Sequence, residues 1–234
     1  MRRVWITRAS PGAQATAERV RALGWDPLVA PLLETKLLPT RIDLTGVAAL
    51  AFTSGAGARA FAQLSERRDL PVFAVGAATA EASRELGFGD VRSADADVAG
   101  LARFIADRAT SLDGAILHAG AAEPAGDLVG DLAARGILAR AQAVYETVDA
   151  EPPAYVFERL AEIEAVLVHS PRAGRRLAET LRDHAAPGLS AYCLSPAVLA
   201  TLDGLELARK RAAPLPNEDA LLSLLRDHPP RKAT

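Results

Sequence analysis

Short apolar runs alternate along the chain with segments whose apolar residues recur every three or four positions. This alternation predicts an α/β fold built on parallel sheets. Strands are expected at 3–7, 27–34, 47–53, 72–75, 115–119, 141–147, 165–169 and 190–194. Helices are expected at 13–23, 58–65, 78–86, 97–109, 126–135, 155–162, 172–183, 196–202 and 217–227. Gly24, Gly87 and Gly136 each follow a helical segment, as expected for helix C-termini, and the tail 228–234 is expected to fray.

Three strand-to-helix junctions occur twice, about 110–120 residues apart. The first set is VWITRAS, LAFTSGAGAR and VFAVGAATA, and the second is AILHAGAAEPAGD, VLVHSPRAGRR and AYCLSPAVL. Unpaired N–H groups and the positive dipole end of a helix N-terminus favour anions. The repeat therefore predicts two similar lobes whose junctions face a ligand with several negative charges. The candidate contacts are Thr7, Arg8, Thr53, Ser54, Gly55, Gly76, Thr79, His118, Gly120, Ser170 and Ser195.

Two weakly patterned connections, at 36–44 and 148–154, follow the first junction unit of each half. We therefore expect residues 1–35 to pack with 155–234 as one lobe, and 45–147 to form an inserted second lobe. The two connections would be linker strands that act as a hinge. A simple division near residue 115 is the competing arrangement.

Composition and charge argue against several classes of function. The 234 residues are 50% hydrophobic and only 5% aromatic, with a net charge of −2, which argues against nucleic-acid binding and anionic membranes and makes any anion site local. The single cysteine, Cys193, excludes an intramolecular disulfide and is expected to be a small buried residue. No metal-ligand spacing, signal-peptide pattern or 18-residue apolar run is found, so we expect a cytoplasmic protein without a metal.

Several side chains allow two interpretations. Ser54, Thr79, Ser170 and Ser195 suit either helix N-caps or ligand contacts. His118 and His169 end strands at repeated junctions and suit a ligand contact or acid–base role, whereas His184 and His228 are expected to be solvated. Tyr145 is either a core aromatic or a phenol that points at the ligand.

The segment Gly55-Ala-Gly57-Ala-Arg-Ala60 matches a loose dinucleotide-binding pattern. That interpretation also needs an acidic residue at the end of the next strand, but this strand ends in Ala74-Val75-Gly76. The glycines equally suit a tight turn with close helix packing, or anion binding by the N–H groups of the turn. No other catalytic motif is present.

Taken in order, FTSGAGARAF, AVGAATAEASRELGF, the strand with Gly120, and DLVGDLAARG leading to VYET resemble the uroporphyrinogen-III synthase family. The opening ITRA and the later VLVHSPRAGRRLAETL and LSPAV extend the resemblance over about residues 4–225. Two departures stand out: HAGAAEPAGD lacks the arginines that many relatives carry there, and Leu194-Ser-Pro-Ala197 lacks their glycine and threonine.

The resemblance implies a cofactor-free lyase of haem biosynthesis that cyclises the linear tetrapyrrole hydroxymethylbilane, with loss of water and inversion of ring D. It implies two α/β lobes joined by a two-stranded linker, with the N-terminal segment in the lobe of the C-terminal half. It also implies that Tyr145 is catalytic, near the departing hydroxyl, and that Thr53, Ser54 and Thr79 contact the substrate. We expect the protein to be a monomer. A two-lobed anion-binding module without turnover, or a dinucleotide-binding oxidoreductase, are the alternatives.

Overall fold

The computed structural model describes residues 2–10, 12–108 and 112–228. The chain divides into two compact units: unit 1 comprises the described residues of Met1–Glu34 and Val148–Thr234, and unit 2 comprises those of Thr35–Thr147. Residue 109 of the expected helix 97–109 and the expected fraying of the tail beyond His228 lie outside the described residues, and the helix itself ends at Ala106.

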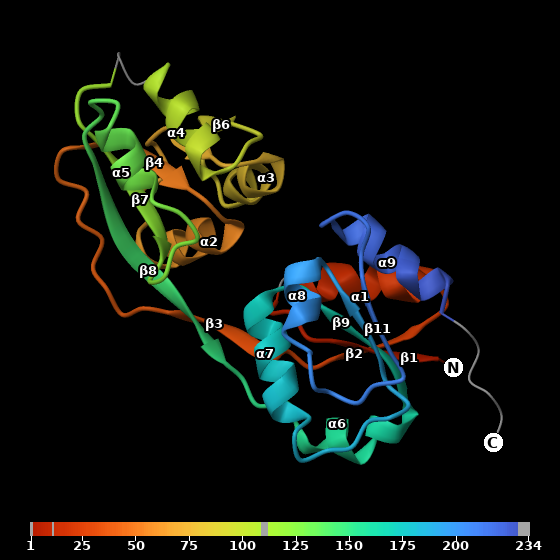
Figure 1. Cartoon of the computed structure of the whole chain (residues 1–234). Helices are drawn as coiled ribbons and strands as arrows, with labels where there is room; N and C mark the ends of the chain where they lie inside the picture. The colour runs from red at the N-terminus through yellow and green to blue at the C-terminus, as the bar shows by residue number, and fades with distance from the viewer. Residues whose placement is uncertain (1, 11, 109–111, 229–234) are drawn as a thin grey trace. The chain divides into compact units, whose positions relative to one another are not determined.

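Unit 1 is built on a five-stranded sheet in the order β11-β10-β9-β1-β2, in which every neighbouring pair is parallel (Figure 1). Its strands are β1 (Arg3–Ile6), β2 (Asp26–Val29), β9 (Ile163–Val168), β10 (Ser190–Cys193) and β11 (Arg209–Ala212). The first two strands of the chain thus join three strands of its C-terminal half.

Helices cover both faces of this sheet. Side chains alternate between the two faces along each strand, so neighbouring residues of β1 pack against different helices. Val4 and Ile6 pack on one face with α1 (Gly12–Ala22) and α9 (Glu218–Arg226). Trp5 packs on the other face with three helices, namely α6 (Ala154–Glu158), α7 (Pro171–Thr180) and α8 (Pro196–Ala200). A short 3₁₀ helix, η2 (Leu160–Glu162), follows α6.

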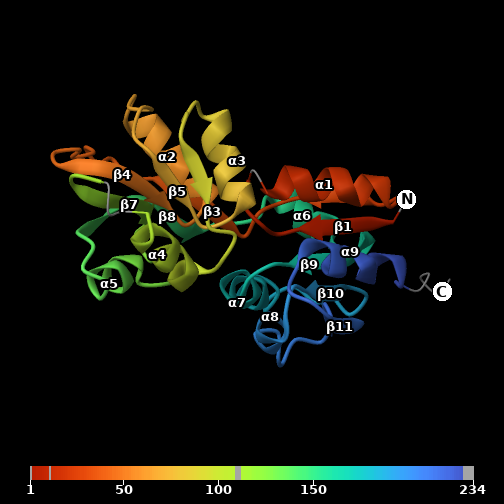
Figure 2. The ribbon, with the colours of Figure 1, turned by 90° about the horizontal axis from the view of Figure 1, so that it is seen from above.

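Unit 2 is built on a six-stranded sheet in the order β3-β8-β7-β4-β5-β6. Its strands are β3 (Leu33–Leu37), β4 (Val47–Phe52), β5 (Val72–Ala74), β6 (Val91–Ser93), β7 (Ala115–Ala121) and β8 (Ala139–Asp149). Helices α2 (Gly55–Leu64) and α3 (Ala77–Glu85) lie on one side of the sheet, and α4 (Val98–Ala106) and α5 (Leu128–Ala133) on the other (Figure 2).

The two sheets follow one plan. In unit 1 the strands before the repeated junctions are β1, β9 and β10, side by side, and in unit 2 they are β7, β4 and β5 in the same order. Each sheet therefore combines junctions from both halves of the sequence, and the expected fold class of two similar parallel-sheet α/β units is confirmed. A division near residue 115 would separate β7 from its parallel neighbour β4.

The chain passes between the units inside strands rather than loops. The first passage lies within β3 and the second within β8, and these strands are neighbours in the sheet of unit 2. The expected strand 27–34 is instead two strands, β2 and β3, separated by residues 30–32. Pro31 lies in this gap and lacks the N–H group that a sheet ladder needs.

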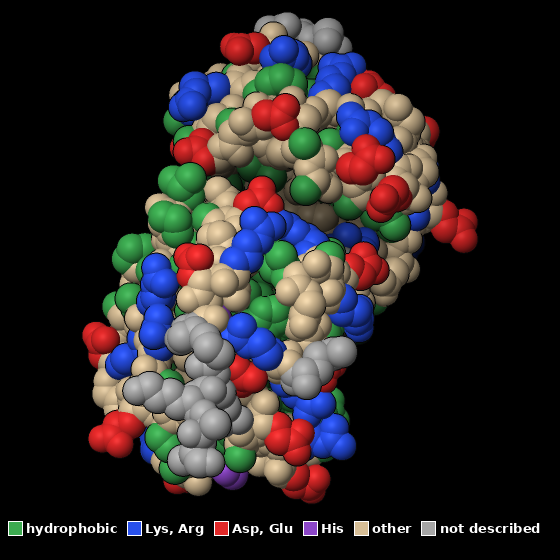
Figure 3. Space-filling model, turned by 90° about the vertical axis from the view of Figure 1, so that its right-hand side faces the viewer, with side chains coloured by type: hydrophobic (Ala, Val, Ile, Leu, Met, Phe, Trp, Pro, Cys, Tyr) green, Lys and Arg blue, Asp and Glu red, His purple; other side chains and the backbone are tan. Residues whose placement is uncertain are grey.

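Two strands, β6 and β11, were not anticipated from the sequence. Both are edge strands of their sheets, and both are rich in polar residues, VRS and RKRA. On the face shown in Figure 3, basic and acidic side chains are interspersed, in keeping with the small net charge. Among the described residues, none of the helices has the length and apolar character needed to cross a membrane.

Candidate functional site

At the junction between β4 and α2 in unit 2, a serine side chain contacts a tyrosine side chain. Ser54 is the N-cap of α2, and its Oγ accepts a hydrogen bond from the Gly57 N–H at 3.1 Å. The same Oγ lies 3.0 Å from the hydroxyl of Tyr145 on β8. A Cβ at Gly57 would lie 2.7 Å from the carbonyl oxygen of Ala119, so glycine allows α2 to approach β7 closely. The close-packing interpretation of these glycines therefore applies to Gly57.

A β-bulge directs Tyr145 toward this junction. Gly120 pairs with Ala143, whereas Ala121, the next residue of β7, pairs with Tyr145, so Val144 is passed over. Without the bulge, Tyr145 would point to the opposite face of the sheet from Ala121. With it, Tyr145 packs on the same face as α2, is 9% exposed, and reaches Ser54.

The neighbouring residue Thr53 contacts a buried histidine. The Nε2 atom of His118 on β7 lies 3.1 Å from the Thr53 Oγ1. Burial lowers the pKa of His118 below its ordinary value, which keeps the ring neutral at neutral pH. Gly120 leaves room for this ring, because a Cβ there would lie 2.8 Å from Nε2.

A cavity of about 210 Å³ opens at this end of the unit 2 sheet. Thr53, Ser54 and Tyr145 line it, together with Thr147 at the end of unit 2. The loop between β7 and α5 forms another part of the wall and contributes Glu123. The cavity is lined by Thr53, Ser54, Val98, Ala121, Glu123, Pro124, Ala125, Gly126, Tyr145 and Thr147.

The third junction of unit 2 differs from the sequence-based expectation. Gly76, not Thr79, is the N-cap of α3, and it makes no side-chain capping bond. Thr79 lies three residues further on and is 7% exposed. Gly55 begins α2 beside the cavity, but Gly55, Gly76 and Thr79 are not among the residues that line it.

In unit 1, two junction serines cap helices. Ser170 accepts a hydrogen bond from the Ala173 N–H at 3.2 Å at the start of α7. Ser195 accepts one from the Val198 N–H at 3.4 Å at the start of α8. The N-cap interpretation is thus confirmed for Ser54, Ser170 and Ser195 and is wrong for Thr79.

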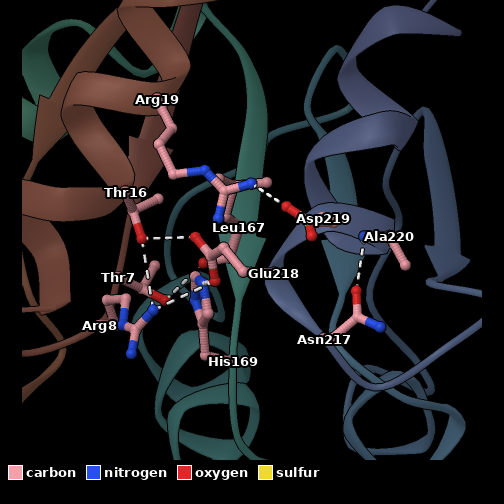
Figure 4. Close-up of polar contacts among 10 residues, drawn as sticks. All are labelled: Thr7, Arg8, Thr16, Arg19, Leu167, His169, Asn217, Glu218, Asp219 and Ala220. Atoms are coloured by element: carbon pink, nitrogen blue, oxygen red, sulfur yellow. Dashed lines mark hydrogen bonds and ion pairs between the residues drawn. The ribbon is translucent and has the colours of Figure 1, made fainter. Parts of the chain in front are cut away.

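Glu218, in the first turn of α9, contacts the polar side chains of Arg8, Thr16 and His169 (Figure 4). The Arg8 Nη1 donates to Glu218 Oε2 at 3.2 Å, and the Thr16 hydroxyl donates to Oε1 at 2.6 Å. His169 Nε2 lies 3.1 Å from Oε2. Burial raises the pKa of Glu218, but hydrogen bonds from His169 and Thr16 and the charges of His169 and Arg8 outweigh it and lower this pKa to about 2.

This arrangement bears on two of the expected contacts. Thr7 is fully buried, and its hydroxyl donates to the Leu167 carbonyl at 2.7 Å, so it could donate to a ligand only if that bond were broken. The Arg8 charge is already compensated by Glu218, which was not among the candidates from the sequence. No local signal marks Glu218, because it lies 210 residues from Arg8 along the chain.

The remaining histidines and the cysteine lie in unit 1. His228 was expected to be solvated, but it is 9% exposed and its Nδ1 lies 2.6 Å from the Tyr192 hydroxyl. His184 stacks on Phe157 with ring centroids 4.1 Å apart. Cys193 is fully buried, as expected, and burial raises its thiol pKa to about 12. Within the described residues, no group of three or more His, Cys, Asp or Glu side chains is placed to hold a metal.

A family model and two solved structures that resemble this chain all point to the same enzyme family. Residues 14–223 match the family model of uroporphyrinogen-III synthase HemD. The fold is similar to uroporphyrinogen-III synthetase from Helicobacter pylori, with a TM-score of 0.66, 18% identity, and coverage of 97% of this chain and 99% of that one. It is also similar to a mutant uroporphyrinogen III synthase from Thermus thermophilus, with a TM-score of 0.52, 17% identity, and coverage of 97% of this chain and 98% of that one. The comparison with curated proteins gives no match.

Proposed function

The chain belongs to the uroporphyrinogen-III synthase family of cofactor-free cyclising lyases, and we propose that the cavity of unit 2 holds the reacting end of its tetrapyrrole substrate. The observation that supports this placement is the pair formed by Tyr145 and Ser54 in the wall of that cavity. A phenol and a hydroxyl beside an accessible space are suited to a substrate that loses a hydroxyl group.

Tyr145 is the proposed catalytic residue. Its phenol would donate a hydrogen bond to the hydroxyl of hydroxymethylbilane as that group departs, and the proton that completes the water is balanced by the proton that ring D loses on ring closure. Ser54 Oγ holds the phenol by the 3.0 Å contact, and the β8 bulge fixes the direction of the ring. Loss of hydroxide from a pyrrolic carbinol is intrinsically easy, so the main task of the protein is to position ring D for attack. Such catalysis needs few specialised side chains.

The substrate carboxylates would be bound by the helix N-termini at the repeated junctions. The first N–H groups of α2, at Gly55 and Ala56, have no intrahelical acceptor, and the positive end of the helix dipole lies there. Thr53 adds a hydroxyl in the cavity wall. We propose corresponding roles for the junctions at Gly76 and Ser170, with the junction at Ser195 secondary because α8 has only five residues.

The test is the identity of the product. The protein is incubated with hydroxymethylbilane generated by a separate enzyme, and the oxidised products are separated by chromatography. Formation of uroporphyrin isomer III supports the proposal. Isomer I alone, as in a control without the protein, would refute it, and saturable substrate binding without isomer III would instead indicate an anion-binding module.

We also propose that the enzyme acts as a cytoplasmic monomer. Size-exclusion chromatography with light scattering should give a mass near 24.6 kDa. A stable dimer, or recovery of the native protein in a non-cytoplasmic fraction, would contradict this proposal.

A further inference from the structure

His118 is a buried polar group that the proposed mechanism leaves without a task. It is 4% exposed and is not among the residues that line the unit 2 cavity. Its Nε2 atom nevertheless lies 3.1 Å from Thr53 Oγ1, and Thr53 does line the cavity. The imidazole therefore stands behind the threonine, on the protein side, and any effect it has on a ligand passes through the Thr53 hydroxyl.

The direction of this hydrogen bond decides what Thr53 offers to a ligand. A hydroxyl has one proton to donate and two lone pairs to accept with. If Nε2 accepts, the Thr53 hydroxyl donates its proton to the ring. Only its oxygen lone pairs then face the cavity, and these lone pairs repel a carboxylate. If Nε2 carries the proton and donates, the Thr53 proton is free to point into the cavity.

We propose that His118, as the Nε2–H tautomer, is a positioning residue that donates to Thr53 Oγ1 so that the Thr53 hydroxyl donates to a substrate carboxylate. This inference rests on the proposed function. It explains how the neutral Thr53 hydroxyl is oriented so that it donates to an anionic ligand. His118 is not a substrate contact in this arrangement, because Thr53 lies between the ring and the cavity.

The sheet holds the imidazole in place for this role. His118 pairs in register with Ala51 on β4, two residues before Thr53, so both polar side chains project from the same face of the sheet. The Cα of Gly120, two residues further along β7, leaves the space that the ring fills. Any larger residue at Gly120 would push the ring away from its present position.

The equivalent place in unit 1 carries different chemistry. There Leu167 of β9 pairs with Ile6 of β1, as Ala51 pairs with His118, and the residue in the place of Thr53 is His169. His169 is bonded to Glu218 rather than to a neighbour on the adjacent strand. The threonine–histidine relay is thus particular to unit 2, where the cavity with Tyr145 lies.

A double-mutant cycle tests the proposal with His118→Leu, Thr53→Val and the double variant. Each single change should raise KM for hydroxymethylbilane by roughly tenfold, with a smaller change in kcat, because one hydrogen bond to a charged group is lost. The double variant should be no worse than Thr53→Val alone, since His118 acts only through Thr53. A KM in the double variant that equals the product of the two single-variant increases would overturn the proposal.

Two further measurements keep the test independent of folding defects and of the proposed function. His118→Gln keeps an amide donor near the position of Nε2 and should recover most of the wild-type KM; a value equal to that of His118→Leu would contradict the proposal. Proton–nitrogen correlation spectra of the histidine rings in the ligand-free protein should show Nε2 protonated, with the His118→Gln variant supplying the assignment. A proton on Nδ1 alone would overturn the tautomer regardless of whether isomer III is formed.

Discussion

Replacing Glu218 with glutamine should destabilise unit 1 by an amount that depends on pH. The carboxylate accepts hydrogen bonds from Arg8, Thr16 and His169, and its side chain is 21% exposed. A carboxyl pKa that falls from 4.5 to about 2 on folding corresponds to roughly 3 kcal/mol of stability above the unfolded pKa. Partial exposure to water reduces this to an expected loss of about 2 kcal/mol in Glu218→Gln at neutral pH.

The pH dependence follows from the lowered pKa. The carboxylate contributes its full stabilisation above about pH 4.5 and loses it as the pH falls through about 2, where the folded protein also takes up the proton. Both tryptophans, Trp5 and Trp25, lie in unit 1, so their fluorescence follows the unfolding of that unit. Urea titrations of wild type and variant should therefore converge between pH 4.5 and 2.

The neighbouring substitution Asp219→Asn is the matched control. Asp219 also lies in the first turn of α9, but its side chain is 88% exposed and pairs only at the surface with Arg19. Its replacement should change stability by less than about 1 kcal/mol. Parallel stability curves for wild type and Glu218→Gln from neutral to strongly acidic pH would show that the Glu218 contacts do not stabilise the carboxylate, and the reasoning would fail.

Three other predictions follow from named contacts. Gly57→Ala should lower the melting temperature of unit 2 with a loss of about 1–3 kcal/mol, because its Cβ meets a backbone carbonyl at 2.7 Å, whereas Gly89→Ala, at an exposed position with no atom within 4 Å of the added Cβ, should be neutral in the same melt. Tyr145→Phe should reduce kcat by about tenfold or more with little change in melting temperature; unchanged turnover would leave Tyr145 a structural residue. Cys193 should resist alkylation in the native protein, since its pKa is raised to about 12 and it is fully buried, and should react once urea unfolds unit 1; rapid labelling of the native form would contradict the packing.

Local patterns gave most of the elements of the fold. Gly24, Gly87 and Gly136, expected just beyond helix ends, all have positive φ angles of 80°, 90° and 73°. The repeated junctions were visible because strand ends and N-cap serines lie in short contiguous segments. The two missed strands, β6 and β11, are edge strands with exposed or half-buried polar side chains, so they carry no apolar run to mark them.

Interactions between distant segments could not be read from the sequence in the same way. The direction of Tyr145 depends on a bulge that appears only when β8 is paired with β7. Glu218 is joined to Arg8 and Thr16 across more than 200 residues. His228 was expected in water because its sequence neighbours are polar, yet Tyr192 and Trp25, both remote in sequence, enclose it.

The position of β1 between β2 and β9 has a consequence for how the protein is made. A chain leaving the ribosome presents β1 and β2 first, but β9 follows only after the whole of unit 2 has emerged. Unit 2 is contiguous and can acquire its structure during translation, while the opening segment waits, with Trp5 and Val4 lacking most of their eventual packing partners. Chains truncated near residue 150 and released from the ribosome should therefore contain a protease-resistant core from unit 2 and a cleavable N-terminal arm.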